Sequence, residues 1–154
     1  MRALRTDDLN QLLHANQVTS RTFLGTFPAC IIPITRKNKY SWVINTESHE
    51  EKGGHWCCFC VDGDKLTFFD SYGRRADDPT LPTYYMVIAE KFRKKHYSSR
   101  RIQGLGSTTC GYFCIHFIYM FSLGVDYMKF LEDYSFTDFE GNDIFVTGFV
   151  KSIS

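Results

Sequence analysis

Cys110 is the residue of this chain whose surroundings best suit it to covalent chemistry. It follows the polar turn Ser107-Thr108-Thr109 and opens an apolar run, Gly111 to Leu123, that predicts a buried helix. A thiol at a helix N-terminus lies near unpaired backbone N–H groups and the positive end of the helix dipole, and both favour the thiolate. The position therefore indicates a nucleophile, although a free cysteine can also be an inert core residue.

Three further side chains could serve that thiolate. His55 begins a predicted strand and offers a base, and Asp70 ends the next predicted strand and offers a carboxylate. The turn Asp62-Gly63-Asp64 predicts a hairpin that brings both to one end, where Asp70 would reach His55 Nδ1. Gln103 could donate to an oxyanion together with the backbone N–H of Cys110. Together these residues predict a cysteine hydrolase. Each residue taken alone could instead have an ordinary structural role.

A cluster of cysteines beside His55 raises the question of a metal site. Along a strand, Cys57 points with His55, whereas Cys58 and Cys60 point to the opposite face. Three converging zinc ligands would require a break in that strand, and no C-x₂-C pair lies elsewhere. We therefore expect no metal and no required cofactor, and interpret these cysteines as small residues that fill both faces of a central strand.

Length and composition suit one globular domain spanning residues 1–154. Hydrophobic residues make up 44% of the chain, which is enough for a core, and the net charge of +1 gives no overall attraction to nucleic acid or membranes. The sequence carries no secretory signal and no apolar run long enough for a membrane span. We expect a soluble monomer with free thiols in a reducing compartment, not a secreted protein.

One segment, from Lys91 to Arg101, concentrates positive charge without an acidic residue. It can be a solvated helix face and turn, or a site for an anion such as DNA. The DNA-binding candidates are Arg93, Lys94, Lys95, Arg100 and Arg101.

The elements that must position the candidate site are both helices and strands. Their order, with strands in the middle and helices before and after, predicts the α+β class. Helices are expected over residues 7–17, 83–96, 110–123 and 127–132 and from about Asn142, strands over 41–45, 55–61, 65–70 and 100–103, and a loop over 23–28.

The ordered motifs of the chain resemble the adenovirus maturation protease family, adenain, and its relatives in adenovirus-like viruses and Polinton/Maverick-type elements. The resemblance runs from about Phe23 to Asn142-Asp143. It rests on Phe23-Leu-Gly-Thr-Phe27, Asn45-Thr46, Gly53-Gly54-His55-Trp56, Phe69-Asp70-Ser71-Tyr72-Gly73 and Gln103 with Ser107 and Cys110-Gly111-Tyr112-Phe113-Cys114. The wider clan includes the SUMO-type proteases, which share His-Trp, Asp and Gln with Cys-Gly.

This resemblance implies a permuted papain-like fold with a central mixed sheet and a buried helix that starts at the nucleophile. It assigns Cys110 as nucleophile, His55 as base, Asp70 as its orienting carboxylate and Gln103 as oxyanion donor. It also implies cleavage of capsid and core precursors next to glycine, in the virion and in the host nucleus or cytoplasm. A narrow approach past Gly54, Trp56 and Gly111 would suit a glycine in the substrate.

The chain departs from the family pattern in two ways. The family has Glu where this chain has Asp70, and no cysteine between Thr83 and Gln103 could tether the activating viral peptide by a disulfide. An activating peptide or DNA is thus implied only by the resemblance. The alternatives are an isopeptidase that removes ubiquitin or SUMO with the same site, an inactive DNA-binding virion scaffold, and a zinc module on Cys57, Cys58 and Cys60.

Overall fold

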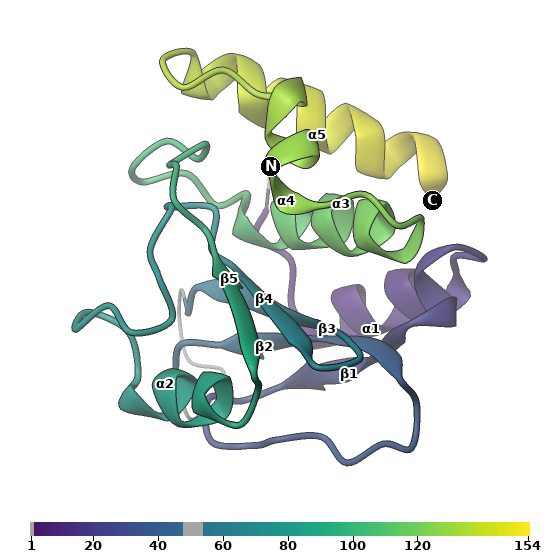
Figure 1. Cartoon of the computed structure of the whole chain (residues 1–154). Helices are drawn as coiled ribbons and strands as arrows, with labels where there is room; N and C mark the ends of the chain where they lie inside the picture. Colours follow the sequence, from purple (N-terminus) through teal and green to yellow (C-terminus); the bar gives the residue numbers. More distant parts are fainter. Residues whose placement is uncertain (1, 48–53) are drawn as a thin grey trace.

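The centre of the fold is a five-stranded mixed sheet (Figure 1), seen in a computed structural model that describes residues 2–47 and 54–154. The strands lie in chain order, and the outer pairs are parallel while the inner pairs are antiparallel. They are β1 (Phe23–Phe27), β2 (Lys39–Asn45), β3 (Trp56–Asp62), β4 (Lys65–Phe69) and β5 (Lys94–Tyr97). The predicted α+β class and central mixed sheet are confirmed.

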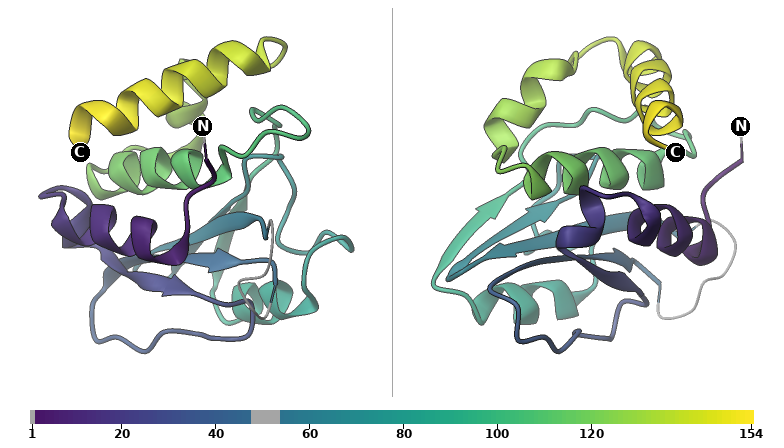
Figure 2. Two further views of the ribbon diagram at one scale, coloured as in Figure 1. Left: turned by 180° about the vertical axis from the view of Figure 1, so that it is seen from behind. Right: turned by 90° about the vertical axis from the view of Figure 1, so that its right-hand side faces the viewer.

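Helices cover both faces of this sheet. On one face lie α1, α3, α4 and α5, and on the other lies α2 (Figures 1 and 2). No helix in the described part of the chain is long and apolar enough to cross a bilayer. The helices are α1 (Thr6–Ala15), α2 (Thr83–Glu90), α3 (Cys110–Ser122), α4 (Tyr127–Phe130) and α5 (Phe139–Ile153), with 3₁₀ turns at Thr19–Arg21 and Leu131–Asp133.

The predicted hairpin of β3 and β4 is confirmed. Its strands pair from Asp62↔Lys65 to Cys58↔Phe69, and Gly63 adopts a φ of 63° in the turn. Residues Trp56 to Val61 are all buried because helices cover both faces of β3. Cys58 and Cys60 pack on the α3 side and Cys57 on the α2 side, so the three thiols do not converge.

The first edge of the sheet differs from the prediction. Residues 23–28 were expected to form a loop, because glycine and proline interrupt the segment, but Phe23–Phe27 forms β1. Gly25 has a φ of 157°, a backbone conformation that residues with a side chain rarely adopt, and pairing with β2 is irregular between Phe23 and Thr26. Backbone pairing with β2 thus outweighs the local turn composition.

The other edge also differs. The helix expected over 83–96 ends at Glu90, and Lys94–Tyr97 instead forms β5 alongside β4. Without this segment the outer backbone groups of β4 would lack partners. Lysines suit such an edge because they oppose pairing with another chain. The strand expected over 100–103 does not form.

The last helix begins earlier than predicted, at Phe139. The side chain of Asp138 accepts a hydrogen bond of 2.9 Å from the backbone N–H of Gly141, which caps the helix. The start near Asn142 was predicted from the spacing of the apolar residues Ile144, Phe145 and Phe149. The capping residue Asp138 lies before these residues, so the helix begins earlier.

Gly73, in the turn after β4, provides a test of this architecture. It has a φ of 79°, and a Cβ there would lie 2.5 Å from backbone atoms of Arg100 and Arg101. Gly63 has a similar φ of 63°, but a Cβ there meets only Asn38, at 4.0 Å. We expect Gly63→Ala to lower the free energy of unfolding by about 1–2 kcal/mol through backbone strain alone. Gly73→Ala should lower it by roughly 3 kcal/mol or more, because backbone atoms cannot yield.

Urea unfolding of the two variants measures this difference. Equal losses of stability would contradict the close approach of the 70–74 turn to the 100–101 backbone.

Candidate active site

His55 and Asp70 meet at the open end of the hairpin, as the sequence predicts. His55 lies just before β3 and Asp70 just after β4, and His55 Nε2 is 2.6 Å from Asp70 Oδ1. The predicted ring atom was wrong, because Asp70 contacts Nε2 and not Nδ1. The ring orientation depends on which side of the imidazole faces α3, and the strand register does not determine it. Nδ1 is thereby left for another partner.

Asp70 is a fully buried carboxylate held by several donors. Besides His55, it accepts hydrogen bonds from Arg74 Nε at 2.6 Å, from the Tyr72 backbone N–H at 3.1 Å and from the Arg74 backbone N–H at 3.3 Å. Burial alone would raise the pKa of Asp70, but the hydrogen bonds and charges of His55 and Arg74 outweigh it and lower that pKa. Asp70 therefore stays ionised beside the imidazole.

Arg74 is a site residue that the sequence reasoning did not identify. Its guanidinium binds Asp70 Oδ2 and lies over the ring of Tyr72, with 5.6 Å from Cζ to the centroid. The sequence could have indicated Arg74, because a buried aspartate at the end of a strand needs a cation or several hydrogen-bond donors as partners. Arg74 lies only four residues after Asp70.

His55 is charged more readily than an ordinary histidine. Burial on its own would lower its pKa, but Cys57, Asp70 and Cys110 together raise it well above the usual value. The ring of Tyr72 stacks on the imidazole with a centroid separation of 4.6 Å and an interplanar angle of 18°. The side chains of both Cys110 and Cys57 contribute to the raised pKa of His55, which places the imidazole close to these two thiols. The imidazole is thus oriented by Asp70, covered by Tyr72 and close to the thiols of Cys57 and Cys110.

Cys110 is the first residue of α3, as predicted, and only 7% of it is exposed. Its Sγ accepts a hydrogen bond of 3.5 Å from the backbone N–H of Trp56, next to His55. The preceding residue, Thr109, donates through Oγ1 to Asp143 of α5 at 2.8 Å, which fixes the start of the helix. Cys114, one turn later, lies in the core.

Gln103 is fully buried in the segment that leads to α3. Its Oε1 accepts a hydrogen bond of 2.5 Å from the Ser71 hydroxyl, and its Nε2 donates to the backbone carbonyl of Ser107 at 3.0 Å. Since Ser71 follows Asp70 directly, the structure brings Gln103 to the same turn that holds His55.

The expected substrate contacts lie in crowded surroundings. A Cβ on Gly54 would be 2.3 Å from Asn45 Oδ1, so a larger residue there would have to displace the Asn45 side chain. A Cβ on Gly111 would be 3.2 Å from Leu4 Cβ, and the indole N–H of Trp56 donates to the Leu4 carbonyl at 2.9 Å. Leu4 therefore covers Gly111 and Trp56, and their role in substrate binding stays a prediction. Gly53 lies outside the described residues.

The predicted basic patch divides into two parts. Arg93, Lys94 and Lys95 are exposed at or beside the edge strand β5. Arg100 and Arg101 instead lie 4.0 Å from the ring centroids of Phe136 and Phe139. The two arginines are thus committed to aromatic contacts, and the role of the whole set in DNA binding stays a prediction.

One group of side chains in the described part of the chain has metal-binding chemistry, namely His55, Cys57 and Asp70, whose ligand atoms lie within 4.8 Å of one another. Two features oppose a cation there. Burial raises the pKa of Cys57 to about 12, and the Arg74 guanidinium already neutralises Asp70. The set therefore fits a hydrogen-bonded catalytic pair better than a metal centre.

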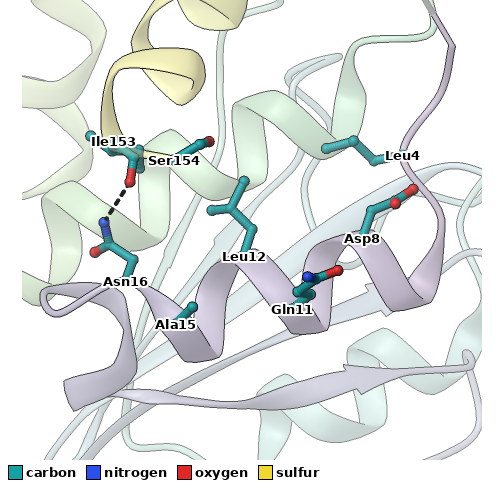
Figure 3. A pocket seen from close by; sticks show the side chains of 8 residues that line it. All are labelled: Leu4, Asp8, Gln11, Leu12, Ala15, Asn16, Ile153 and Ser154. Carbon is teal, nitrogen blue, oxygen red and sulfur yellow. Dashed lines mark hydrogen bonds between the residues drawn. The ribbon is translucent and has the colours of Figure 1, made fainter.

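A pocket of about 430 Å³ lies away from these residues, between α1 and the end of α5 (Figure 3). Its lining includes Leu12, Asn16 and Ile153, and Asn16 Nδ2 donates to the Ile153 carbonyl at 3.3 Å. No cysteine or histidine lines it. Leu4 borders both this pocket and the Trp56–Gly111 wall, but the candidate catalytic residues lie at the start of α3 and at the open end of the β3–β4 hairpin.

Comparison with known proteins identifies relatives among viral proteases. A family model described as adenovirus endoprotease matches residues 22–141. The protease of Bovine adenovirus 7 is 29% identical over 137 residues, covering 79% of this chain and 66% of that protein. The protease of Bovine adenovirus 2 is 28% identical over 113 residues, covering 64% and 54%.

Two further kinds of relative were found. Uncharacterized protein V9 of Sputnik virophage is 24% identical over 143 residues, covering 79% of this chain and 74% of V9. Two crystal structures of an ASFV protease are 24% identical, with TM-scores of 0.47 and 0.46, and the match covers 71% of this chain and 42% or 43% of theirs. The chain thus spans 54–74% of the length of the sequence relatives and less than half of these crystallised chains.

The family match begins before β1 and ends in α5, so it includes the whole sheet and every candidate catalytic residue. It agrees with the resemblance seen in the ordered motifs and with the permuted papain-like fold which that resemblance implies. The chain belongs to the adenovirus endoprotease family of cysteine proteases.

Proposed function

We propose that this chain is a cysteine endopeptidase that cleaves viral capsid or core precursor proteins next to glycine. The observation that carries the proposal is the His55–Asp70 hydrogen bond of 2.6 Å beside Cys110, at the N-terminus of α3. A thiol close to a base that is hydrogen-bonded to an orienting carboxylate is the arrangement that nucleophilic catalysis requires. The glycine preference and the precursor substrates come from the family resemblance.

In the proposed mechanism Cys110 transfers its proton to His55, and the Asp70 carboxylate stabilises the imidazolium. The thiolate then attacks the scissile carbonyl carbon, and the oxyanion is held by the Gln103 amide and the Cys110 backbone N–H. His55 donates its proton to the leaving amine, which gives a thioester on Cys110. Water, deprotonated by His55, hydrolyses the thioester and regenerates the thiol.

The substrate class can be tested against the isopeptidase alternative, which would use the same residues. A capsid-type peptide with Gly-Gly before the cleaved bond is compared with a fusion of ubiquitin or SUMO to a reporter. Faster cleavage of the peptide supports the proposal, and exclusive cleavage of the fusion contradicts it. We propose that the enzyme acts as a monomer in the virion and in the infected cell. A viral peptide or DNA is the candidate activator.

The first prediction concerns the reactivity of Cys110. Cys57, Cys58 and Cys114 are buried, and burial raises the pKa of each, so they should resist alkylation at neutral pH. Cys30 is exposed and would compete, so it is replaced by serine in all the proteins compared. Substoichiometric iodoacetamide should label Cys110 at pH 7, roughly tenfold or more faster than in a His55→Ala variant, because His55 holds the thiolate.

Peptide mass spectrometry locates the label. Even labelling of the remaining cysteines, or a rate at Cys110 that does not depend on His55, would contradict the nucleophile assignment.

A second prediction concerns the protonation of His55. The pKa of His55 is raised partly by its hydrogen bond with Asp70, so Asp70→Asn should lower it. The imidazolium is lost as pH rises through this pKa. The alkaline limb of kcat/KM should therefore move to lower pH in the variant.

NMR titration of the histidine rings measures the pKa without a substrate. His116 is an internal control, because burial on the far side of α3 lowers its pKa to about 4, and that value should not change. An unchanged His55 titration in Asp70→Asn would show that Asp70 does not stabilise the imidazolium.

A third prediction concerns DNA. Replacement of Arg93, Lys94 and Lys95 by glutamine should weaken binding to duplex DNA and reduce the salt dependence of log K by up to about three. The matched control replaces three exposed cations elsewhere, Arg36, Lys37 and Lys151. Fluorescence anisotropy at several salt concentrations gives both quantities. Equal affinity of wild type and the first variant would remove DNA as a partner of this edge.

A further inference from the structure

Ser71 contacts the Gln103 segment through both its backbone and its side chain. Its carbonyl accepts hydrogen bonds from the backbone N–H groups of Ile102 at 2.9 Å and Gln103 at 3.1 Å. Its hydroxyl donates to Gln103 Oε1 at 2.5 Å. Both Ser71 and Gln103 are fully buried, so solvent has little access to replace these contacts.

The hydrogen bonds of the Gln103 amide determine which way it faces. The Ser107 carbonyl can only accept, so the group next to it at 3.0 Å must be the Nε2 amino group. Oε1 is then on the Ser71 side, where the hydroxyl donates to it. A flipped amide would place Oε1 against the Ser107 carbonyl and lose that hydrogen bond, because a carbonyl cannot donate. The observed orientation uses one N–H of Nε2 on Ser107 and leaves the second N–H for another acceptor.

We propose that Ser71 is a positioning residue, which holds the Gln103 amide in the orientation that presents its second N–H to the oxyanion. This inference rests on the proposed function and adds a residue to it. Ser71 follows Asp70 directly, so one dipeptide at the end of β4 orients both the base and the oxyanion donor. A displacement of the β4 end would therefore disturb both together.

Removal of the hydroxyl has a specific consequence. In Ser71→Ala the buried Oε1 loses its donor, and the amide is held only by Ser107, about which it can rotate. The oxyanion donor is then misplaced, whereas His55, Asp70 and Cys110 keep their contacts. We expect kcat to fall about 10- to 100-fold with little change in KM, and alkylation of Cys110 by iodoacetamide to stay near the wild-type rate.

The test compares Ser71→Ala, Gln103→Ala and the double variant, with a peptide that has Gly-Gly before the cleaved bond. If Ser71 acts through Gln103, its replacement causes no further loss of kcat in the Gln103→Ala background. Ser122→Ala is the matched control, because this buried hydroxyl bonds Thr22 and the Ile118 carbonyl in α3, away from the site. A wild-type kcat in Ser71→Ala, or the same loss in both backgrounds, would overturn the proposal.

A second measurement needs no turnover. The Gln103 side-chain N–H signals, assigned by NMR, should show one slowly exchanging proton in the wild type and in Ser122→Ala, and faster exchange in Ser71→Ala. Unchanged exchange in Ser71→Ala would overturn the positioning role even if the proposed peptidase activity is established. Conversely, this signal would persist if the peptidase proposal failed, so the two failures are distinguishable.

Discussion

The buried carboxylate of Asp70 is the constraint on which the rest of the site depends. A fully buried charge is tolerated only when it is paired and hydrogen-bonded, and Asp70 has His55, Arg74 and two backbone N–H groups as partners. These contacts close the turn after β4 and leave His55 Nδ1 for α3. The same carboxylate raises the pKa of the imidazole. The hydrogen bond that helps to stabilise the buried charge of Asp70 is therefore also the one that favours the protonated form of His55.

The fold places this carboxylate where a second element can reach it. Helices bury both faces of β3, which makes the hairpin a rigid support for His55 and Asp70 at its open end. Helix α3 packs against the same strand and begins at Cys110. The sulfur of Cys110 accepts a hydrogen bond from the backbone N–H of Trp56. The proposed nucleophile and base thus come from elements far apart in sequence, and both lie against β3.

Much of this arrangement could be predicted from local sequence. The Asp62-Gly63-Asp64 turn set the register of β3 and β4, and the polar turn before an apolar run located the start of α3 at Cys110. The edge strands could not be predicted, because β1 and β5 exist through pairing with β2 and β4 and have weak local signals. The ring atom of His55, the Arg74 ion pair and the Leu4 contact depend on tertiary packing, which spacing along the chain does not encode.

The central claim is that Cys110 becomes acylated by substrate with His55 as its proton partner. Acid quenching during cleavage of a Gly-Gly peptide, followed by mass spectrometry, measures this directly. The account predicts a thioester of the N-terminal peptide fragment on Cys110 in the wild type and none in Cys110→Ala. Cleavage without any adduct, or an adduct on another cysteine, would contradict it.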